Sequence, residues 1–182
     1  MFEELKIICW PDPRLTRMSK NLENVDGNIH DLARRMLALM HEAKGVGLAA
    51  PQVGQNIRLF VMNPTQKPED DRVYINPVLL DAEGEIEGEE GCLSLPGINV
   101  PVVRARRIHI QALDLHGNPV DQDEADYIAR ICQHEFDHLN GTLLLDHMGA
   151  VARMANRRTI KEMEEKYLEE HPAPAKKPRR RS

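Results

Sequence analysis

Cysteine, aromatic residues and long apolar runs are all scarce in this chain of 182 residues. Its three cysteines are few and odd in number, so we expect free thiols in a reducing compartment and no disulfide framework. Aromatic residues make up 4% of the chain, which leaves aliphatic side chains and methionine to fill the core. No apolar run approaches the roughly 20 residues of a membrane-spanning helix. The first residues lack the pattern of a secretion signal, and we expect a cytoplasmic protein without membrane contact.

A hydrophobic share of 41% and a charged share of 29% are typical of one soluble globular domain at this length. The net charge of −5 hides a strongly basic end, KKPRRRS. We expect residues 1–170 to form a single catalytic domain. Residues 171–182 are predicted to be a disordered tail that either contacts a polyanion such as RNA or only aids solubility. Elsewhere no basic stripe with interleaved aromatic residues is present, so DNA is not an expected partner.

The order of the hydrophobic patterns predicts a single α+β domain, with antiparallel strands packed around a central helix and a further helix near the C-terminus. Helices are expected over residues 28–44, 123–139 and 150–170, and strands over 58–62, 73–76 and 107–114. Residues 83–91 are acidic and punctuated by glycine, which is typical of a loop or a hairpin.

The strongest chemical signal is the segment HEFDH, residues 134–138. Residues four apart lie one above the other on a helix, so the imidazoles of His134 and His138 can converge on one metal ion. Glu135 can then reach a water molecule on that metal without being a ligand, an arrangement suited to hydrolysis. The alternative is a helix with ordinary surface histidines. Tyr127 and Ile131 share the histidine face, and they are either core residues or the wall of a pocket beside the metal.

A catalytic metal site usually takes three protein ligands, so a third ligand is needed. Cys132 lies two residues before His134, about 200° around the helix, and points away from the metal. Cys9 lies in a proline-rich turn with nothing nearby that suggests chemistry. Cys92 lies in an irregular segment, EGCLSLP, where glycine permits close backbone approach. Cys92 is therefore the predicted third ligand, and the alternative is that it is a buried structural thiol. A ligand set of one thiolate and two imidazoles fits zinc as well as other transition metals.

The stretch GVGLAAPQVG, residues 45–54, is rich in small residues. It lacks the Gly-Lys-Ser/Thr ending of a phosphate loop, so a nucleotide site is not expected. Gln52 is its one polar side chain, and its amide could donate a hydrogen bond to a developing oxyanion. Taken alone, the stretch is as consistent with an ordinary tight turn.

Taken together and in this order, the three segments resemble the peptide deformylase family. That family is marked by GxGLAAxQ, EGCLS and HExDH motifs, which stand here at residues 45–52, 90–94 and 134–138. The early PDPRL, residues 11–15, and the strand and turn RIHIQALDLHGNP are also similar. The resemblance covers about residues 6–150, and three ordered motifs are far more specific than any one of them.

The resemblance implies removal of the formyl group from the N-formylmethionine that starts new bacterial or organellar proteins. It implies Fe(II) as the metal, with Ni, Co or Zn as substitutes, and N-formylmethionyl nascent chains as the substrate. The implied metal ligands are Cys92, His134 and His138. The implied catalytic groups are Glu135 as acid and base, and the Gln52 side chain and Leu93 backbone N–H as oxyanion donors. The implied substrate-binding residues are Val46, Gly47, Glu90 and Gly91.

Three further features bear on the comparison with the family. Asp126 stands where the family commonly has glycine, and we expect only a local change there, since an acidic residue suits a helix start. Residues 97–99 lack an arginine that some members use against the peptide backbone. Some members also dock a C-terminal helix on the ribosome, and the helix at 150–170 with its basic tail is a candidate for the same contact.

Two other function classes fit parts of the sequence. A zinc endopeptidase shares HExxH but would take a third ligand downstream, where Asp146 and His147 lie past the Asn-Gly helix end. A structural metal module or RNA-binding protein would need a fourth ligand, and the nearest carboxylate, Asp137, lies on another helix face. Asp137 is instead expected to pair with an arginine such as Arg104.

Overall fold

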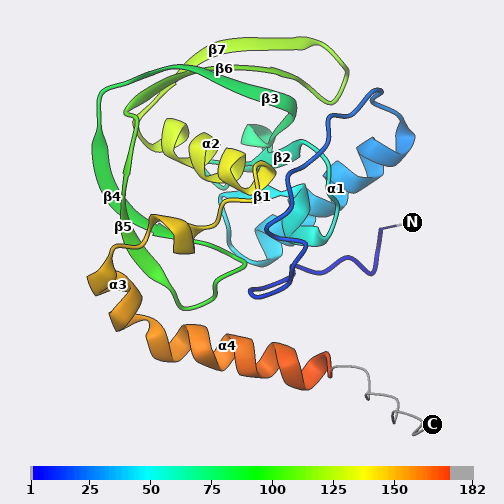
Figure 1. Cartoon of the computed structure of the whole chain (residues 1–182). Helices are drawn as coiled ribbons and strands as arrows, with labels where there is room; N and C mark the ends of the chain where they lie inside the picture. Colours follow the sequence, from blue (N-terminus) through cyan, green and yellow to red (C-terminus); the bar gives the residue numbers. More distant parts are fainter. Residues whose placement is uncertain (1, 173–182) are drawn as a thin grey trace, which may run out of the picture.

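The computed structural model describes residues 2–172. The predicted basic tail falls almost entirely on residues 173–182, outside the described part. A five-stranded antiparallel sheet and a two-stranded ribbon surround α2, with α1 behind the sheet and α3 and α4 below (Figure 1). This arrangement confirms the predicted α+β class.

The strands divide between the large sheet and the ribbon. The large sheet has the order β1-β2-β3-β6-β7, and its strands are β1 (Gly47–Ala49), β2 (Leu59–Met62), β3 (Arg72–Glu83), β6 (Arg107–Leu113) and β7 (Pro119–Ala125). The ribbon consists of β4 (Ile86–Gly91) and β5 (Asn99–Arg104). The helices are α1 (Gly27–Glu42), α2 (Asp126–Leu139), α3 (Ala150–Ala155) and α4 (Arg157–Glu170).

Strand β2 shows why α1 and α2 lie on opposite faces of the sheet. All four residues of β2 are buried, because successive side chains point to opposite faces and each face carries a helix. Leu59 and Val61 pack against α1, while Phe60 and Met62 pack against α2. The two hydrophobic layers hold α2 firmly inside the domain.

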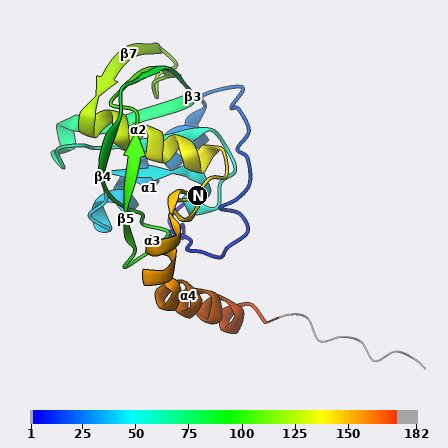
Figure 2. The ribbon, with the colours of Figure 1, turned by 60° about the vertical axis from the view of Figure 1, so that its left-hand side comes forward.

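A third hydrophobic cluster joins the ribbon to the C-terminal part of the chain. Val100 and Val102 of β5 pack with the Leu143–Leu145 segment, and Ile160 and Met163 of α4 lie against the same cluster. Trp10 donates a hydrogen bond from its indole to Glu164 of α4, at 3.3 Å. Helix α4 therefore lies beneath the ribbon and the N-terminal segment (Figure 2). Among the described residues, no helix combines the length and apolar character needed to cross a bilayer.

Several predicted elements require correction. The helix expected from residue 123 begins at Asp126, and strand β7 was missed because its exposed face is polar. The acidic stretch 83–91, expected to be a loop or a hairpin, is largely strand β4, and its pairing with β5 confirms the hairpin. The helix expected over 150–170 is divided at Asn156. The stretch from residue 45 contains edge strand β1 and a short 3-10 helix, Ala50–Val53, so it is more than a tight turn.

Asp126 provides a test of the backbone at the start of α2. It has a φ of 50°, in the left-handed region that favours glycine, and its side chain is exposed and pairs with Arg106. Glycine adopts this conformation without strain, which fits the glycine that the family resemblance implies at this position. We expect Asp126→Gly to raise the free energy of unfolding by about 1 kcal/mol in urea denaturation, since the exposed ion pair contributes little. Asp126→Ala should lower the free energy of unfolding. Equal stability of the two variants would show that the left-handed conformation of residue 126 is not strained.

Candidate active site

The three predicted metal ligands meet at one point inside the domain. The sulfur of Cys92 and one ring nitrogen each of His134 and His138 all lie within 4.8 Å of one another. The Cys92 Sγ lies 3.4 Å from His138 Nε2. Within residues 2–172, no other group of three His, Cys, Asp or Glu side chains is arranged in this way. The third ligand that an endopeptidase would take downstream is not found there, nor is the fourth ligand of a closed site.

Local structure explains this convergence. His134 and His138 lie one turn apart on α2, with ring centroids 5.1 Å apart. Cys92 directly follows β4 and begins a turn closed by a 2.9 Å hydrogen bond from Leu95 N–H to its carbonyl. Cys132 faces away from the ligands and its sulfur lies 3.7 Å from that of Met62, as expected from its place on the helix.

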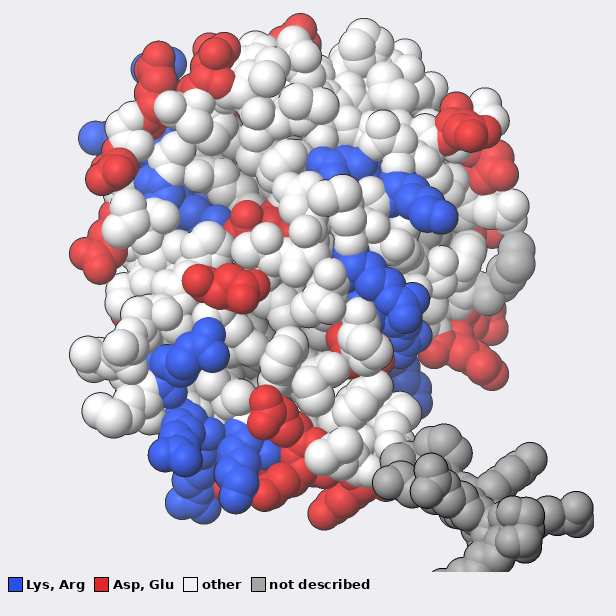
Figure 3. Space-filling model, viewed as in Figure 1, with Lys and Arg blue, Asp and Glu red and all other residues white. Residues whose placement is uncertain are grey.

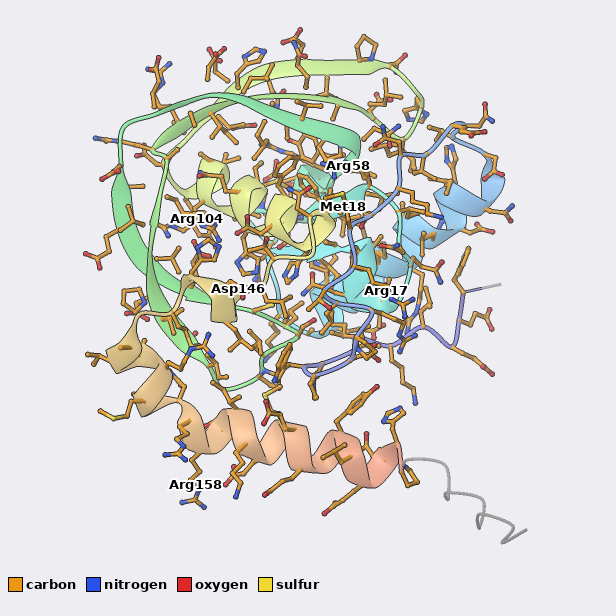
Figure 4. The ribbon with its side chains drawn as sticks, viewed as in Figure 1. Arg17, Met18, Arg58, Arg104, Asp146 and Arg158 are labelled. Carbon is orange, nitrogen blue, oxygen red and sulfur yellow. The ribbon has the colours of Figure 1, made fainter. Side chains whose placement is uncertain are left out.

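Glu90 orients His134. It accepts a 2.9 Å hydrogen bond from His134 Nδ1, which leaves Nε2 for the ligand cluster. Burial alone would raise the pKa of Glu90, but hydrogen bonds from His134 and Arg104 hold that pKa well below its usual value. Arg104, which lies between the ribbon and α2 (Figure 4), also pairs with Asp137 at 2.6 Å, as predicted.

The charges of the cluster fit a bound cation. Burial, with help from His134 and Arg104, keeps the pKa of His138 well below its usual value, so the ring is neutral as a metal ligand must be. Burial also lowers the pKa of His134, but hydrogen bonding of its ring to Cys92 and to the Glu90 carboxylate outweighs burial and raises that pKa. A positive charge is therefore favoured between Cys92 and His134. One thiolate and two imidazoles are the donor set that transition metals prefer.

Glu135 lies beside the ligands and has no partner of its own. Its side chain is 3% exposed, and its Oε2 makes no hydrogen bond within the described residues. Burial raises the pKa of Glu135 to about 7, which suits a group that must accept and then donate a proton near neutral pH. Gly47 of β1 leaves room for this carboxylate, because a Cβ there would lie 2.9 Å from Glu135 Cγ.

Gln52 is held with its amide nitrogen toward the cluster. The backbone N–H of Ala49 donates to Gln52 Oε1 at 2.8 Å, so the amide cannot flip without losing this bond. Its Nε2 lies 3.2 Å from Ser94 Oγ and 3.5 Å from Cys92 Sγ. The single polar side chain of the small-residue stretch is thus a fixed donor at the site.

A cavity of about 420 Å³ opens beside the ligands. This volume is in the usual range for small-ligand sites. One wall is the free edge of β1 and the segment before it, and another is β4, whose only strand partner is β5. The predicted site residues that line the cavity are Val46, Gly47, Gln52, Glu90, Gly91, Cys92, Leu93, Tyr127, Ile131, His134 and Glu135.

Two of these predicted residues need comment. The side chain of Tyr127 is 52% exposed, so it lies at the mouth of the cavity. The carboxylate of Glu90 is fully engaged by His134, Arg104 and Arg130, so its side chain is not available to a ligand in the cavity. Arg130 itself was not predicted, although it lies one helical turn before His134 and thus on the same face.

Comparison with known proteins agrees with this geometry. The family model for polypeptide deformylase matches residues 4–154. The chain belongs to the peptide deformylase family. A peptide deformylase of Alkalilimnicola ehrlichii is 42% identical over 160 residues, which cover 87% of this chain and 90% of the relative.

Solved structures of the family have the same fold. A peptide deformylase of Plasmodium falciparum is 38% identical with a TM-score of 0.89, over 92% of this chain and all of the other. A plant peptide deformylase is 36% identical with a TM-score of 0.90, over 94% and 95% of the two chains. The chain is therefore an enzyme, a hydrolase of the peptide deformylase class.

The three cysteines provide a test of the metal site. We expect Cys92→Ala to bind well below one metal ion per chain, because it removes one of three ligands. Cys9→Ala and Cys132→Ala should keep the metal, since Cys132 faces the core and the Cys9 sulfur lies 4.0 Å from the Leu93 carbonyl, outside the ligand cluster. Elemental analysis of anaerobically purified protein measures this. Full metal content in Cys92→Ala would remove Cys92 from the site.

Proposed function

We propose that this enzyme removes the formyl group from N-formylmethionine at the amino end of newly made proteins, by metal-dependent hydrolysis with Glu135 as general base and then general acid. Family membership supports action on formylated nascent peptides. The observation that carries the finer proposal is the meeting of three metal-ligand side chains and one orphaned buried carboxylate beside a cavity between two free strand edges.

Cys92, His134 and His138 would hold one metal ion, which we propose to be Fe(II), with Ni, Co or Zn as substitutes. A metal in this position supplies Lewis acidity: it lowers the pKa of a water molecule and polarises the formyl oxygen. Glu90 supports the same set by fixing the ring orientation of His134. Three protein ligands leave room for water and substrate, as in other catalytic sites.

Glu135 moves the proton. As a carboxylate it takes a proton from the attacking water, and the oxygen of that water forms a bond to the formyl carbon. It then gives the proton to the nitrogen as the carbon–nitrogen bond breaks, which releases formate and a free amino terminus. A pKa of about 7 leaves it able to hold either state at neutral pH.

Gln52 and the Leu93 backbone N–H would stabilise the negative oxygen that develops on the formyl carbon. Donors that are already aimed lower the barrier because they need no reorganisation during the reaction. The bond from Ala49 N–H to Gln52 Oε1 keeps the amide nitrogen directed to this point.

The strand edges suggest how a peptide binds. An extended substrate can add its backbone along Val46 and the first residue of β1, Gly47, and along β4 at Glu90 and Gly91. The methionine side chain would then lie against Ile131, which is 4% exposed, with Tyr127 at the mouth. An extended chain between two edges fits the unfolded amino end of a nascent protein.

Cytoplasmic location and a ribosome contact are also proposed. In α4 three of the four basic residues pair with acidic residues one turn on, as Arg158–Glu162, Lys161–Glu165 and Lys166–Glu170. Basic side chains gather at the first turns of α4, which carry Arg157, Arg158 and Lys161, and acidic side chains lie beside and beyond them (Figure 3). A contact with ribosomal RNA would use this basic end together with the tail at 173–182, and co-sedimentation with ribosomes with and without that tail measures the share of the tail.

A substrate series tests the proposed reaction. We expect turnover of formyl-Met-Ala-Ser with release of formate, no measurable release of acetate from acetyl-Met-Ala-Ser, and no cleavage of casein. The physical reason is that a formyl group has only hydrogen on its far side and fits the narrow space beside Gln52. Metal removal by a chelator should abolish turnover, and readdition of Fe(II) under anaerobic conditions should restore it. Cleavage of casein would support an endopeptidase instead.

Two substitutions test the role of Glu135. Glu135→Gln should keep its metal and lose at least about 100-fold in kcat, since the amide cannot carry the proton. Gly47→Ala should also lower kcat, because its Cβ would displace the Glu135 carboxylate. Gly27→Ala is the matched control, since a Cβ there meets nothing within 4 Å. Wild-type kcat in Glu135→Gln would exclude the carboxylate from the reaction.

A further inference from the structure

The two-stranded ribbon, which forms one wall of the cavity, makes no strand pairing with the large sheet within residues 2–172. β4 pairs only with β5, and the two strands continue from β3 and β6 without pairing to any further strand of residues 2–172. The position of the β4 edge relative to α2 is therefore held by side chains, together with the short connections to β3 and β6. This position matters, because the proposed substrate would pair with β4 while the histidine ligands lie on α2.

Arg130 spans this gap, alongside the Arg104–Asp137 ion pair and the hydrogen bond between Glu90 and His134. It lies on α2, is 9% exposed, and reaches carbonyl oxygens of both ribbon strands. Its Nη2 donates to the Ile86 carbonyl at 2.7 Å, and its Nη1 donates to the Val102 carbonyl at 2.9 Å and the Gly88 carbonyl at 3.4 Å. One guanidinium thus joins β4, β5 and α2.

Arg130 also reaches the carboxylate that orients a metal ligand. Its Nη1 lies 2.8 Å from Glu90 Oε1, which also accepts from Arg104 Nε at 2.9 Å. The other oxygen, Oε2, accepts from Arg104 Nη2 and His134 Nδ1, each at 2.9 Å. The carboxylate therefore accepts four hydrogen bonds, which is about its full capacity, and each partner restricts the others.

Gly88 shows that the guanidinium lies directly against β4. A Cβ at Gly88 would come within 3.0 Å of Arg130 Nη2 and 3.1 Å of its Cζ. The glycine is thus matched to the arginine across the interface between strand and helix. A larger residue in the strand would push the guanidinium away from the three carbonyl groups.

We infer that Arg130 is a positioning residue, which locks the substrate-binding edge of β4 onto α2 and makes it one rigid unit with His134 through Glu90. The inference rests on the proposed function, from which it takes the peptide substrate. Arg130 does not need to touch the reacting atoms. Its loss is expected to loosen the wall that a peptide pairs with while leaving Glu135, Gln52 and the ligands in place.

Steady-state kinetics of Arg130→Met tests this inference, because methionine keeps the length and apolar volume of the side chain but none of its donors. With formyl-Met-Ala-Ser we expect KM to rise about tenfold while kcat stays within about threefold, since misplacement of the binding edge weakens binding of the peptide. Arg130→Lys, which can still pair with Glu90, should recover part of the change. Arg58→Met is the control: Arg58 is half-buried and bonds to Asn140 and the Pro77 carbonyl away from the cavity.

Hydrogen exchange gives a readout that does not depend on activity. Amides of β4 in Arg130→Met should exchange at least about tenfold faster than in the wild type, whereas those of β2 should not. Should Arg130→Met fail to fold, Gly88→Ala tests the same contact with the guanidinium retained, and it should also raise KM. Wild-type KM and β4 exchange in these variants would overturn the inference. A wild-type enzyme without turnover on formyl-Met-Ala-Ser would instead contradict the proposed function, and β4 exchange would still test the contact of Arg130 with the ribbon.

Discussion

The buried carboxylate of Glu90 is the interaction on which the site depends. It is 6% exposed, and its four hydrogen bonds come from β5 through Arg104 and from α2 through Arg130 and His134. Two residues further along the chain stands Cys92, so one short segment carries both the thiol ligand and the group that orients a histidine ligand. Burying such a charge is costly unless every partner is present, and removal of one partner leaves an uncompensated charge. The network is therefore better understood as fixing one geometry than as adding stability.

The same packing that holds α2 also sets the chemistry of its side chains. Because α1 and α2 cover opposite faces of β2, α2 is enclosed by strands, and Glu135 is removed from water. Burial raises its pKa to about 7, while the equally buried Glu90, surrounded by cationic donors, stays ionised. Two glutamates of one site thus differ in pKa for a physical reason: Glu90 stays ionised, whereas Glu135 can hold either protonation state near neutral pH, as its proposed task requires. The cavity of about 420 Å³ then lies beside the ligands, lined by residues of β1 and β4.

Local patterns were sufficient to predict the centre of the site but not its surroundings. The four-residue spacing of His134 and His138 places them on one face of any helix. A glycine directly before Cys92 indicates a backbone that a ligand can approach closely. Both features depend only on residues that are close in the sequence. The pairing of Asp137 with Arg104 was also predicted and is confirmed. Strand β7 was missed because an exposed edge strand alternates polar residues and shows little hydrophobic signal. The four bonds of Arg130 could not be predicted, because they join residues 28–44 positions apart whose proximity depends on the tertiary fold.

The central claim is that one sulfur and two imidazole nitrogens share a metal ion, and X-ray absorption spectroscopy of the metal-loaded protein tests it most directly. With zinc in the site, the account predicts one sulfur neighbour at about 2.3 Å and two histidine nitrogens at about 2.0–2.1 Å, together with a light oxygen neighbour from solvent. A spectrum without a sulfur neighbour, or with only one imidazole, would contradict the account.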